Sequence, residues 1–222
     1  MGTVTDSNKG SRTAAQVAAS GSRRVIVGIT GASGSIYGQR MVQVLLRLGL
    51  EVHLVATPAA VSTWGFELNE PLAADRLAQD DERPRLIIHP TDDLFASIAS
   101  GSYRTCGMVV IPCSVKTLAA IAQGFSDNLL TRAADVCLKE RRPLVLVLRE
   151  TPLSLVHLEN MARAVRAGAV VLPASPGFYD HPKTIDDLVD FIVGRALDHL
   201  IDGHGIGPRW TGTEGEGSWH AC

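Results

Sequence analysis

Short apolar runs alternate along the chain with longer segments in which apolar residues recur at helical spacing. The runs are rich in β-branched residues, and several are apolar at almost every position, as in RVIVGI, GMVVI and LVLVL. Strands that are apolar on both faces are typical of parallel sheets covered on both sides. The predicted strands span residues 24–29, 51–56, 85–89, 107–111, 144–148 and 169–172.

The segments between these strands predict helices over residues 35–49, 58–65, 115–123, 128–140, 154–167 and 184–200. The last helix begins with Thr184 as its N-cap and carries Asp186 and Asp187 in its first turn, where carboxylates stabilise the helix dipole. Regular β-α alternation predicts an α/β fold with a doubly wound, mostly parallel sheet and helices on both faces.

The two ends of the chain differ from this pattern. Residues 1–22 are rich in Ser, Thr, Gly and Ala and contain no aromatic residue, so we expect a disordered tail, although a transit peptide stays an alternative. Residues 23–202 are predicted to form one domain. Residues 203–222 are Gly-rich and predicted to be a flexible tail, in which Arg209 and Trp210 could anchor the chain to the domain or to a neighbouring subunit.

Composition removes several classes of protein. The 222 residues include 21 Lys and Arg against 23 Asp and Glu, a balance that offers no electrostatic footprint for nucleic acid. The longest strongly apolar run, Leu144 to Leu148, is too short to span a membrane. The four cysteines contain no C-x-x-C pair, which disfavours a zinc site or a disulfide scaffold and predicts reduced thiols in a cytoplasmic protein.

Segments that could bind a ligand directly follow several of the predicted strands. In doubly wound sheets ligands bind outside the carboxyl ends of the strands. Four polar or Gly-rich segments follow predicted strands there and should converge on one edge: residues 31–34, 112–117, 149–152 and 173–179.

Two of these segments favour a phosphate group. The Gly31–Gly34 turn lets a ligand approach the backbone at a helix N-terminus, although it fits neither G-x-G-x-x-G nor a Walker A loop, and a plain tight turn is the alternative. Ser114, Lys116 and Thr117 offer hydroxyls and an ammonium at a second helix start, where Ser114 could equally be a simple N-cap. Together the two segments suggest a mononucleotide-type cofactor.

Arg149 and Glu150 follow a strand that is predicted to be fully buried, so these charges should face a site or a partner. A structural ion pair at the sheet edge is the alternative. The basic run that ends the preceding helix, Lys139 with Arg141 and Arg142, is explained for the two arginines by the helix dipole, and spacing does not separate Lys139 from them.

We predict no metal site. Residues 186–190 spell D-D-x-x-D, a pattern that binds magnesium diphosphate in all-helical prenyl synthases, but here it follows a helix N-cap in an α/β chain. The histidines, among them His157 and His181, lack metal-ligand spacing and are expected on the surface or in packing.

Four stretches resemble the flavin prenyltransferase (UbiX) family, which includes the small subunits of hydroxyarylic acid decarboxylases. They are GITGASGSIYG, SGSYRTCGMVVIPCSVKTLAAI, NLLTRAADVCLKERRPLVLVLRETPLSLVHLENM and PGFYDHPKTIDDLVDFIVGRALD. The resemblance implies a Rossmann-like three-layer sandwich in a homo-oligomer, typically a dodecamer. It implies metal-independent transfer of a dimethylallyl group from dimethylallyl phosphate to N5 and C6 of reduced FMN, and a UbiD-type decarboxylase that receives the prenylated FMN.

The resemblance also implies roles for individual residues. FMN would be held by Gly31, Ala32, Ser33, Thr57, Ser114, Val115, Lys116, Thr117 and Arg149, with Ser33 near N5. The prenyl phosphate would meet Lys139, Glu150, Tyr179 and Arg195, in a pocket lined by Ala99, Ser100 and Gly101. The implied catalytic residues are Ser33, Glu150 as acid and base, and Lys139, Tyr179 and Arg195. The chain has Thr57-Pro58 where the family commonly has Ser-Lys, which retains the hydroxyl and loses the lysine.

Two other functions stay open at this point. A flavin-dependent decarboxylase that acts on cysteine-type substrates has a related fold, but its P-x-M-N-x-x-M-W signature is missing here. A non-catalytic FMN carrier, or a subunit of an aromatic-acid decarboxylase complex, is the other alternative.

Overall fold

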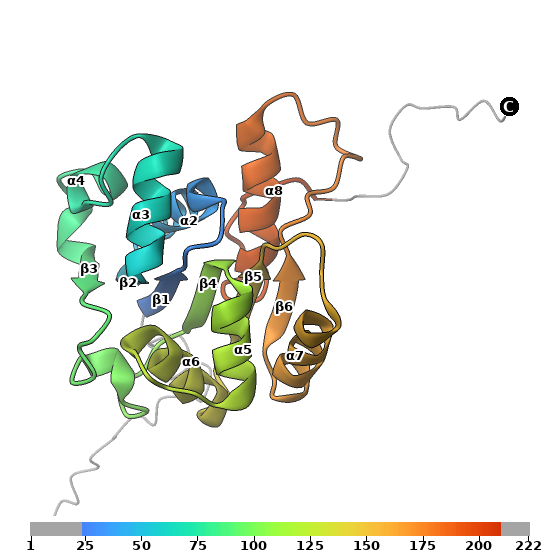
Figure 1. Cartoon of the computed structure of the whole chain (residues 1–222). Helices are drawn as coiled ribbons and strands as arrows, with labels where there is room; N and C mark the ends of the chain where they lie inside the picture. The colour runs from blue at the N-terminus through green and yellow to red at the C-terminus, as the bar shows by residue number, and fades with distance from the viewer. Residues whose placement is uncertain (1–23, 210–222) are drawn as a thin grey trace, which may run out of the picture.

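A single six-stranded sheet forms the middle of the protein (Figure 1). The computed structural model describes residues 24–209. The strand order is β3-β2-β1-β4-β5-β6, and every neighbouring pair is parallel, which confirms the predicted doubly wound sheet. The strands are β1 (Arg24–Ile29), β2 (Glu51–Ala56), β3 (Leu86–His89), β4 (Gly107–Cys113), β5 (Leu144–Leu148) and β6 (Val170–Pro173).

The helices follow the predicted positions, with differences at their ends. They are α2 (Ser35–Arg47), α3 (Pro58–Leu68), α4 (Ala74–Leu77), α5 (Val115–Gln123), α6 (Leu129–Lys139), α7 (Leu155–Arg166) and α8 (Ile185–Leu197), with 3₁₀ turns at Arg83–Arg85 and Ser97–Ala99. Helix α3 runs past Gly65 and ends where Asn69 adopts a left-handed conformation, with φ of 53°. The short α4 and the two 3₁₀ turns were not predicted.

Strand β4 is also longer than predicted, since it continues through Pro112 to Cys113. Proline has no N–H for the sheet ladder, and the pairing of β4 with β5 shifts register between Val110 and Cys113. The strand therefore carries its irregularity at the carboxyl edge, where the loops of the candidate site begin.

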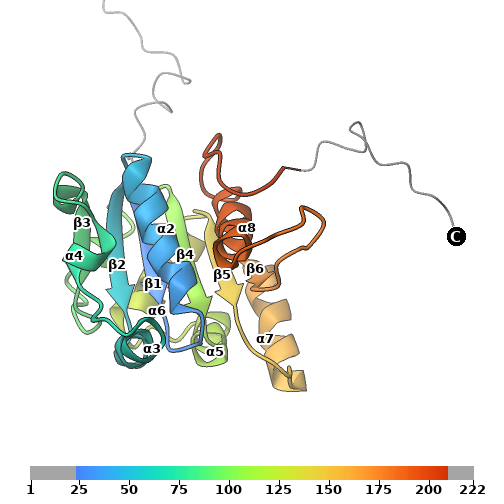
Figure 2. The same cartoon turned by 90° about the horizontal axis from the view of Figure 1, so that it is seen from above.

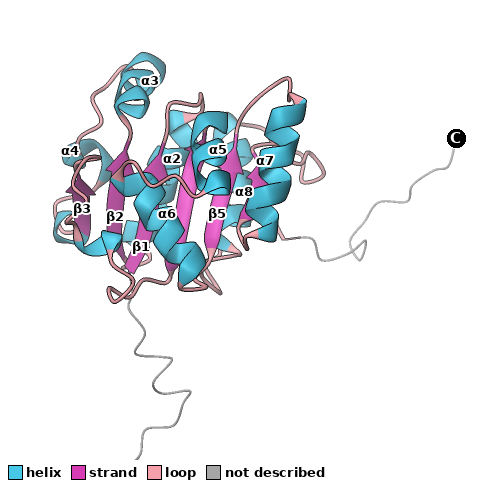
Figure 3. Ribbon diagram, turned by 60° about the horizontal axis from the view of Figure 1, so that its bottom comes forward, coloured by secondary structure: helices cyan, strands magenta, loops and turns pink. Residues whose placement is uncertain are grey.

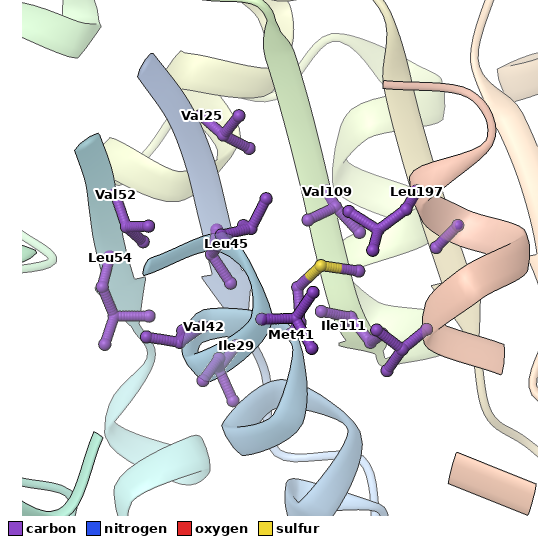
Figure 4. Close-up of a cluster of buried hydrophobic side chains, with 14 of the residues drawn as sticks. Val25, Ile29, Met41, Val42, Leu45, Val52, Leu54, Val109, Ile111 and Leu197 are labelled. Atoms are coloured by element: carbon purple, nitrogen blue, oxygen red, sulfur yellow. The ribbon is translucent and has the colours of Figure 1, made fainter. Parts of the chain in front are cut away.

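Helices cover both faces of the sheet, as Figure 3 shows. On one face, side chains such as Val25, Val52 and Val109 pack against α2 and α8 (Figure 4). On the other, Ile26, Met108 and their neighbours pack against α5, α6 and α7. Burial on both sides explains why the central strands are apolar at nearly every position.

Most helices begin with a side-chain cap that the sequence supplies. Thr184 accepts from Asp187 N at 3.1 Å, and Asp187 Oδ2 accepts from Thr184 N at 2.9 Å. Asp190 holds Arg40 through two contacts, of 2.6 and 2.7 Å. The D-D-x-x-D motif thus serves a helix start and an ion pair, which confirms the structural interpretation of it.

The structure describes part of the predicted C-terminal tail and none of the N-terminal one. The tail of residues 1–22 lies outside the described residues, as do Trp210 and Cys222. Residues 203–209 have no regular secondary structure, but His204 within them is only 6% exposed. Arg209 lies against Asp198 and His204, so this arginine does anchor the segment to the domain.

Thr30 ties the ends of β1 and β4 together at the point where the strand order reverses. Its hydroxyl donates to Pro112 O at 2.7 Å and accepts from Ser114 N at 2.8 Å, and the residue is 1% exposed. One buried side chain therefore fixes the distance between the two loops that follow these strands.

Replacing Thr30 with Val should lower the free energy of unfolding by about 1–3 kcal/mol, because the partly buried Ser114 N–H loses its acceptor. Thr30→Ser keeps the hydroxyl and is the matched control, with a smaller loss. Urea unfolding at one fixed protein concentration measures both variants. Equal stability of Thr30→Val and the wild type would contradict this role.

Candidate active site

The candidate site lies at the carboxyl edge of the sheet, beside the switch point between β1 and β4. Figure 2 shows the strand arrowheads pointing to the edge at which α3 and α5 begin, while the loop after α8 lies at the opposite edge. Doubly wound sheets bind their ligands outside this edge, at the switch point. Because the strands are parallel, the loops after β1, β4, β5 and β6 all begin at this edge, as predicted.

The turn after β1 is closed by a carboxylate from α3. Gly34 has a φ of 112°, a conformation that favours glycine, and its N–H donates to both carboxylate oxygens of Glu67 at 3.0 and 3.1 Å. Ser35 N donates to Glu67 Oε2 at 2.7 Å. A phosphate bound at this helix N-terminus would need these amides free, but they already donate to Glu67, which compensates the positive end of α2.

Glu67 also binds the side chain of Ser33. Burial acts to raise the pKa of this carboxyl group, but hydrogen bonds from the Ser33 hydroxyl and from the Ser35 and Gly34 amides outweigh it and lower the pKa. Glu67 is therefore ionised at neutral pH, and the Ser33 hydroxyl is one of the groups that stabilise its charge. Sequence reasoning missed Glu67, since a single acid in the middle of a helix carries no spacing signal.

Arg149 reaches the same turn from β5. Its Nε donates to Ser33 O at 3.1 Å, and its backbone N–H donates to Cys113 O at 3.2 Å. Glu150 Oε1 accepts from Thr151 N at 3.0 Å, and both charged side chains are partly buried. Arg149 is therefore brought to the Gly31–Gly34 turn, and within residues 24–209 it forms no direct ion pair with Glu150.

The hydroxyls of the other two loops act as helix caps. Ser114 Oγ accepts from Thr117 N at 3.3 Å and donates to Thr117 Oγ1 at 3.2 Å, while Lys116 is exposed and Val115 half-buried. Thr57 Oγ1 likewise accepts from Ala60 N at 3.1 Å. The N-cap interpretation of Ser114 is confirmed, and contact of these residues with a flavin stays a prediction.

The departure from the family pattern at Thr57-Pro58 fits the local structure. Pro58 is the first residue of α3, a position at which the missing N–H of proline costs nothing and its fixed φ suits the helix. The loop therefore exchanges a lysine side chain for a stiffer helix start, while the Thr57 cap is retained.

A second group of predicted site residues lies at the opposite edge of the sheet. Lys139 ends α6 and donates to Glu140 Oε1 at 2.6 Å. A Cβ added at Gly101 would lie 2.8 Å from Lys139 Nζ, so the segment Ala99–Gly101 lies next to Lys139 at this edge. One protomer therefore does not bring these residues to the turn that holds Ser33.

Arg195 belongs to that opposite edge as well. It lies in the last turn of α8, and a Cβ added at Gly107, where β4 begins, would lie 2.8 Å from Leu200 just beyond that helix. Tyr179, from the loop after β6, packs edge-on against Phe191 with ring centroids 5.8 Å apart. The residues expected around the prenyl phosphate are thus dispersed within one chain.

Three further expectations concern metals, membranes and cysteines. Within residues 24–209 no three His, Cys, Asp or Glu side chains gather as a metal site would need, and His157 belongs to the capping box of α7. No helix in that part of the chain is long and apolar enough to cross a membrane. Cys106, Cys113 and Cys137 form no disulfide there.

Comparison with known proteins places this site in a family. The profile of the Flavoprotein family matches residues 14–197. Flavin prenyltransferase UbiX of Halalkalibacterium halodurans is 50% identical over 196 residues, covering 83% of this chain and 91% of the relative. The enzyme of the same name from Thauera aromatica is 48% identical over 191 residues, covering 86% and 95%. This chain belongs to the flavin prenyltransferase UbiX family.

Solved structures agree with this assignment to the UbiX family. AnUbiX (PadA1) in complex with FMN and dimethylallyl pyrophosphate superposes with a TM-score of 0.79 and 45% identity, covering 87% of this chain and all of that one. A dodecameric FMN-dependent UbiX-like decarboxylase from Escherichia coli O157:H7 gives 0.75 and 44%, covering 85% and 99%. The Rossmann-like fold expected from the resemblance is confirmed.

The cysteine-type decarboxylase alternative is less similar. A mutant of PPC decarboxylase with bound pantothenoylaminoethenethiol is 20% identical at a TM-score of 0.55. At this identity the likeness shows a shared fold alone.

Glu67→Gln should destabilise this UbiX-family protein by about 1–3 kcal/mol at pH 7, because an amide donates where a charged acceptor is needed. The pKa of Glu67 is lowered from 4.5 on folding, so its contribution is present above that pH and is lost as pH falls through the lower value of the folded state. The stability difference between wild type and variant, measured by urea unfolding, should therefore shrink below about pH 4.5.

Glu70→Gln, at a neighbouring acid that contacts Gln39 and Arg76, serves as the control. A difference between wild type and Glu67→Gln that stays constant from pH 7 to pH 4 would contradict the ionised state of Glu67.

Proposed function

We propose that this protein is a flavin prenyltransferase, which transfers a dimethylallyl group from dimethylallyl phosphate to reduced FMN. The observation that carries the proposal is the linked arrangement of Glu67, Ser33 and Arg149 on the glycine turn, in a chain 50% identical to a flavin prenyltransferase. The reaction breaks the allylic C–O bond and releases phosphate, while reduced FMN, when bound, supplies the N5 and C6 atoms that receive the five-carbon group.

The residues at the carboxyl edge fit FMN by their chemistry. A mononucleotide requires backbone close to its ring and polar or cationic groups around its phosphate. Gly31, Ala32 and the exposed Ser33 provide the backbone approach, and the caps at Thr57 and Ser114 begin two helices beside it. Lys116 and the terminal nitrogens of Arg149 supply positive charge, so these are the residues that would hold FMN.

Ser33 and Glu67 can accept a proton together. The Ser33 hydroxyl donates to an ionised Glu67, which leaves the lone pairs of Ser33 Oγ free to accept a hydrogen bond from a ligand N–H. A proton taken up at Ser33 Oγ can pass on to the Glu67 carboxylate in the same step. This pair therefore serves the bond-forming side of the reaction, next to the position that the resemblance gives to N5.

Departure of phosphate needs positive charge around its oxygens, because negative charge develops on them as the allylic bond breaks. Arg149, Lys139 and Arg195, with the Tyr179 hydroxyl, are the groups we assign to this task. Ala99, Ser100 and Gly101 would line the apolar side of the pocket. Glu150, half-buried after β5, would act as acid and base during closure of the new ring.

These assignments require more than one subunit. Strand β1 has six residues, and at about 3.3 Å per residue the two edges of the sheet are roughly 17–20 Å apart. A single dimethylallyl phosphate molecule is too short to bridge that distance. Arg149 lies at one edge and Lys139 and Arg195 at the other. A homo-oligomer, such as the dodecamer formed by the relative from Escherichia coli O157:H7, would bring the two edges of different copies together.

The product would be consumed by a UbiD-type decarboxylase in the cytoplasm.

The cysteines bear on the compartment. Burial raises the pKa of the Cys113 and Cys137 thiols to about 12, so both stay protonated and unreactive at neutral pH. Free thiols of this kind support a reducing compartment.

The test is to incubate the assembled protein with reduced FMN and dimethylallyl phosphate without oxygen and to weigh the flavin. We expect the flavin mass to rise by one dimethylallyl group. Glu150→Gln should bind FMN as tightly as the wild type and lower the rate of product formation by about a hundred-fold or more. Glu159→Gln, an exposed acid on α7, is the matched control.

An unchanged flavin mass with the wild-type protein would overturn the proposed transfer. Full product formation by Glu150→Gln would remove Glu150 from the mechanism and leave the transfer itself in place.

A further inference from the structure

A carboxylate at the end of α8 gathers three nitrogen groups. Asp198 Oδ2 accepts from Arg195 Nη1 at 2.6 Å, while Asp198 Oδ1 lies 2.5 Å from Arg209 Nη1 and 3.0 Å from His204 Nε2. The Asp198 side chain is 16% exposed, against 51% for Arg195 and 53% for Arg209. A mostly buried acid therefore holds two guanidinium groups that reach the surface.

Three contacts hold His204 in the cluster. Ile206 N donates to His204 Nδ1 at 3.0 Å, while His204 Nε2 lies 3.0 Å from Asp198 Oδ1 and 2.9 Å from Arg209 Nη2. The imidazole therefore links the backbone of the segment to both Asp198 and Arg209.

Asp198 occupies an unfavourable position for an acid. It caps the carboxyl end of α8, where the helix dipole is negative, and burial acts to raise its pKa. Hydrogen bonds from His204 and Arg209 and the positive charges of Arg209 and Arg195 outweigh burial and lower the pKa. The local donors thus maintain an ionised carboxylate one helical turn after Arg195.

The segment that supplies two of these donors is fitted closely to α8. A Cβ added at Gly194 would clash with the carbonyl oxygen of Ile206, so only glycine allows this approach. Gly207 follows with a φ of 75°, against the carbonyl of Asp190. The segment of residues 203–209 is therefore seated on the helix next to Arg195.

We propose that Asp198 is a positioning residue that orients the Arg195 guanidinium toward the phosphate of the prenyl substrate, with His204 and Arg209 locking Asp198 in place. This inference rests on the proposed function, in which Arg195 meets that phosphate. Asp198 engages one terminal nitrogen of Arg195, and a guanidinium has five N–H donors, so enough remain for a phosphate. The carboxylate fixes a long side chain that would otherwise sample many rotamers.

Removing the carboxylate should act on substrate binding through Arg195. We expect Asp198→Asn to raise the KM for dimethylallyl phosphate about tenfold, as expected for one misplaced charged hydrogen bond. It should also lower kcat, because Arg195 is assigned to the charge that develops on the departing phosphate, while FMN affinity stays nearly unchanged. Calorimetric titration with inorganic phosphate should show a similar loss of affinity. Asp202→Asn, at an exposed acid in the same loop, is the control and should change neither quantity.

A double-mutant cycle separates positioning from a purely structural role. If Asp198 acts through Arg195, Asp198→Asn should have no further effect on KM or phosphate affinity in an Arg195→Gln background. If Asp198→Asn does not assemble, as size-exclusion chromatography would report, the cycle uses Asp198→Glu, which keeps the charge but displaces it by one methylene. The same loss should then appear with Arg195 present and vanish without it.

The failures of the two proposals differ. Equal losses in both backgrounds, or no loss in either, with an active wild type overturn the positioning role and leave the transferase intact. A wild type that leaves the flavin mass unchanged overturns the proposed function and this inference together.

Discussion

Burial of a parallel sheet on both faces is the constraint on which the rest of this structure depends. The central strands have no side available for polar groups, because α2 and α8 cover one face and α5, α6 and α7 the other. Polar and charged side chains therefore collect where the strands begin and end. Such side chains therefore lie at the edge where β1, β4 and β5 end and at the opposite edge, where the strands begin.

At both edges a carboxylate organises the groups around it. Glu67 orders the Gly34 turn and polarises Ser33, while Asp198 holds Arg195 and Arg209. In each case several hydrogen bonds keep an acid ionised against the cost of its burial.

The separation of the two edges links the fold to assembly. Residues proposed to hold the flavin lie after β1, β4 and β5, while Lys139 and Arg195, proposed to meet the prenyl phosphate, lie at the opposite edge. Under these proposed roles a complete site needs the edges of different copies to meet. A homo-oligomer would then be required for the chemistry, and not only for stability.

The sequence by itself determined the strands, the helix starts and the edge at which the site lies, because these depend on local patterns: apolar runs, capping residues and glycine turns. Motifs such as GITGASG and LVLVLRETP also fixed the family. Only the tertiary structure decided that Glu67 occupies the amides of α2 and that Asp198 holds Arg195 and Arg209. It also decided that Lys139 lies far from Ser33. Such contacts join residues from separate elements, and their distances follow from how helices pack on the sheet, which no spacing along the chain encodes.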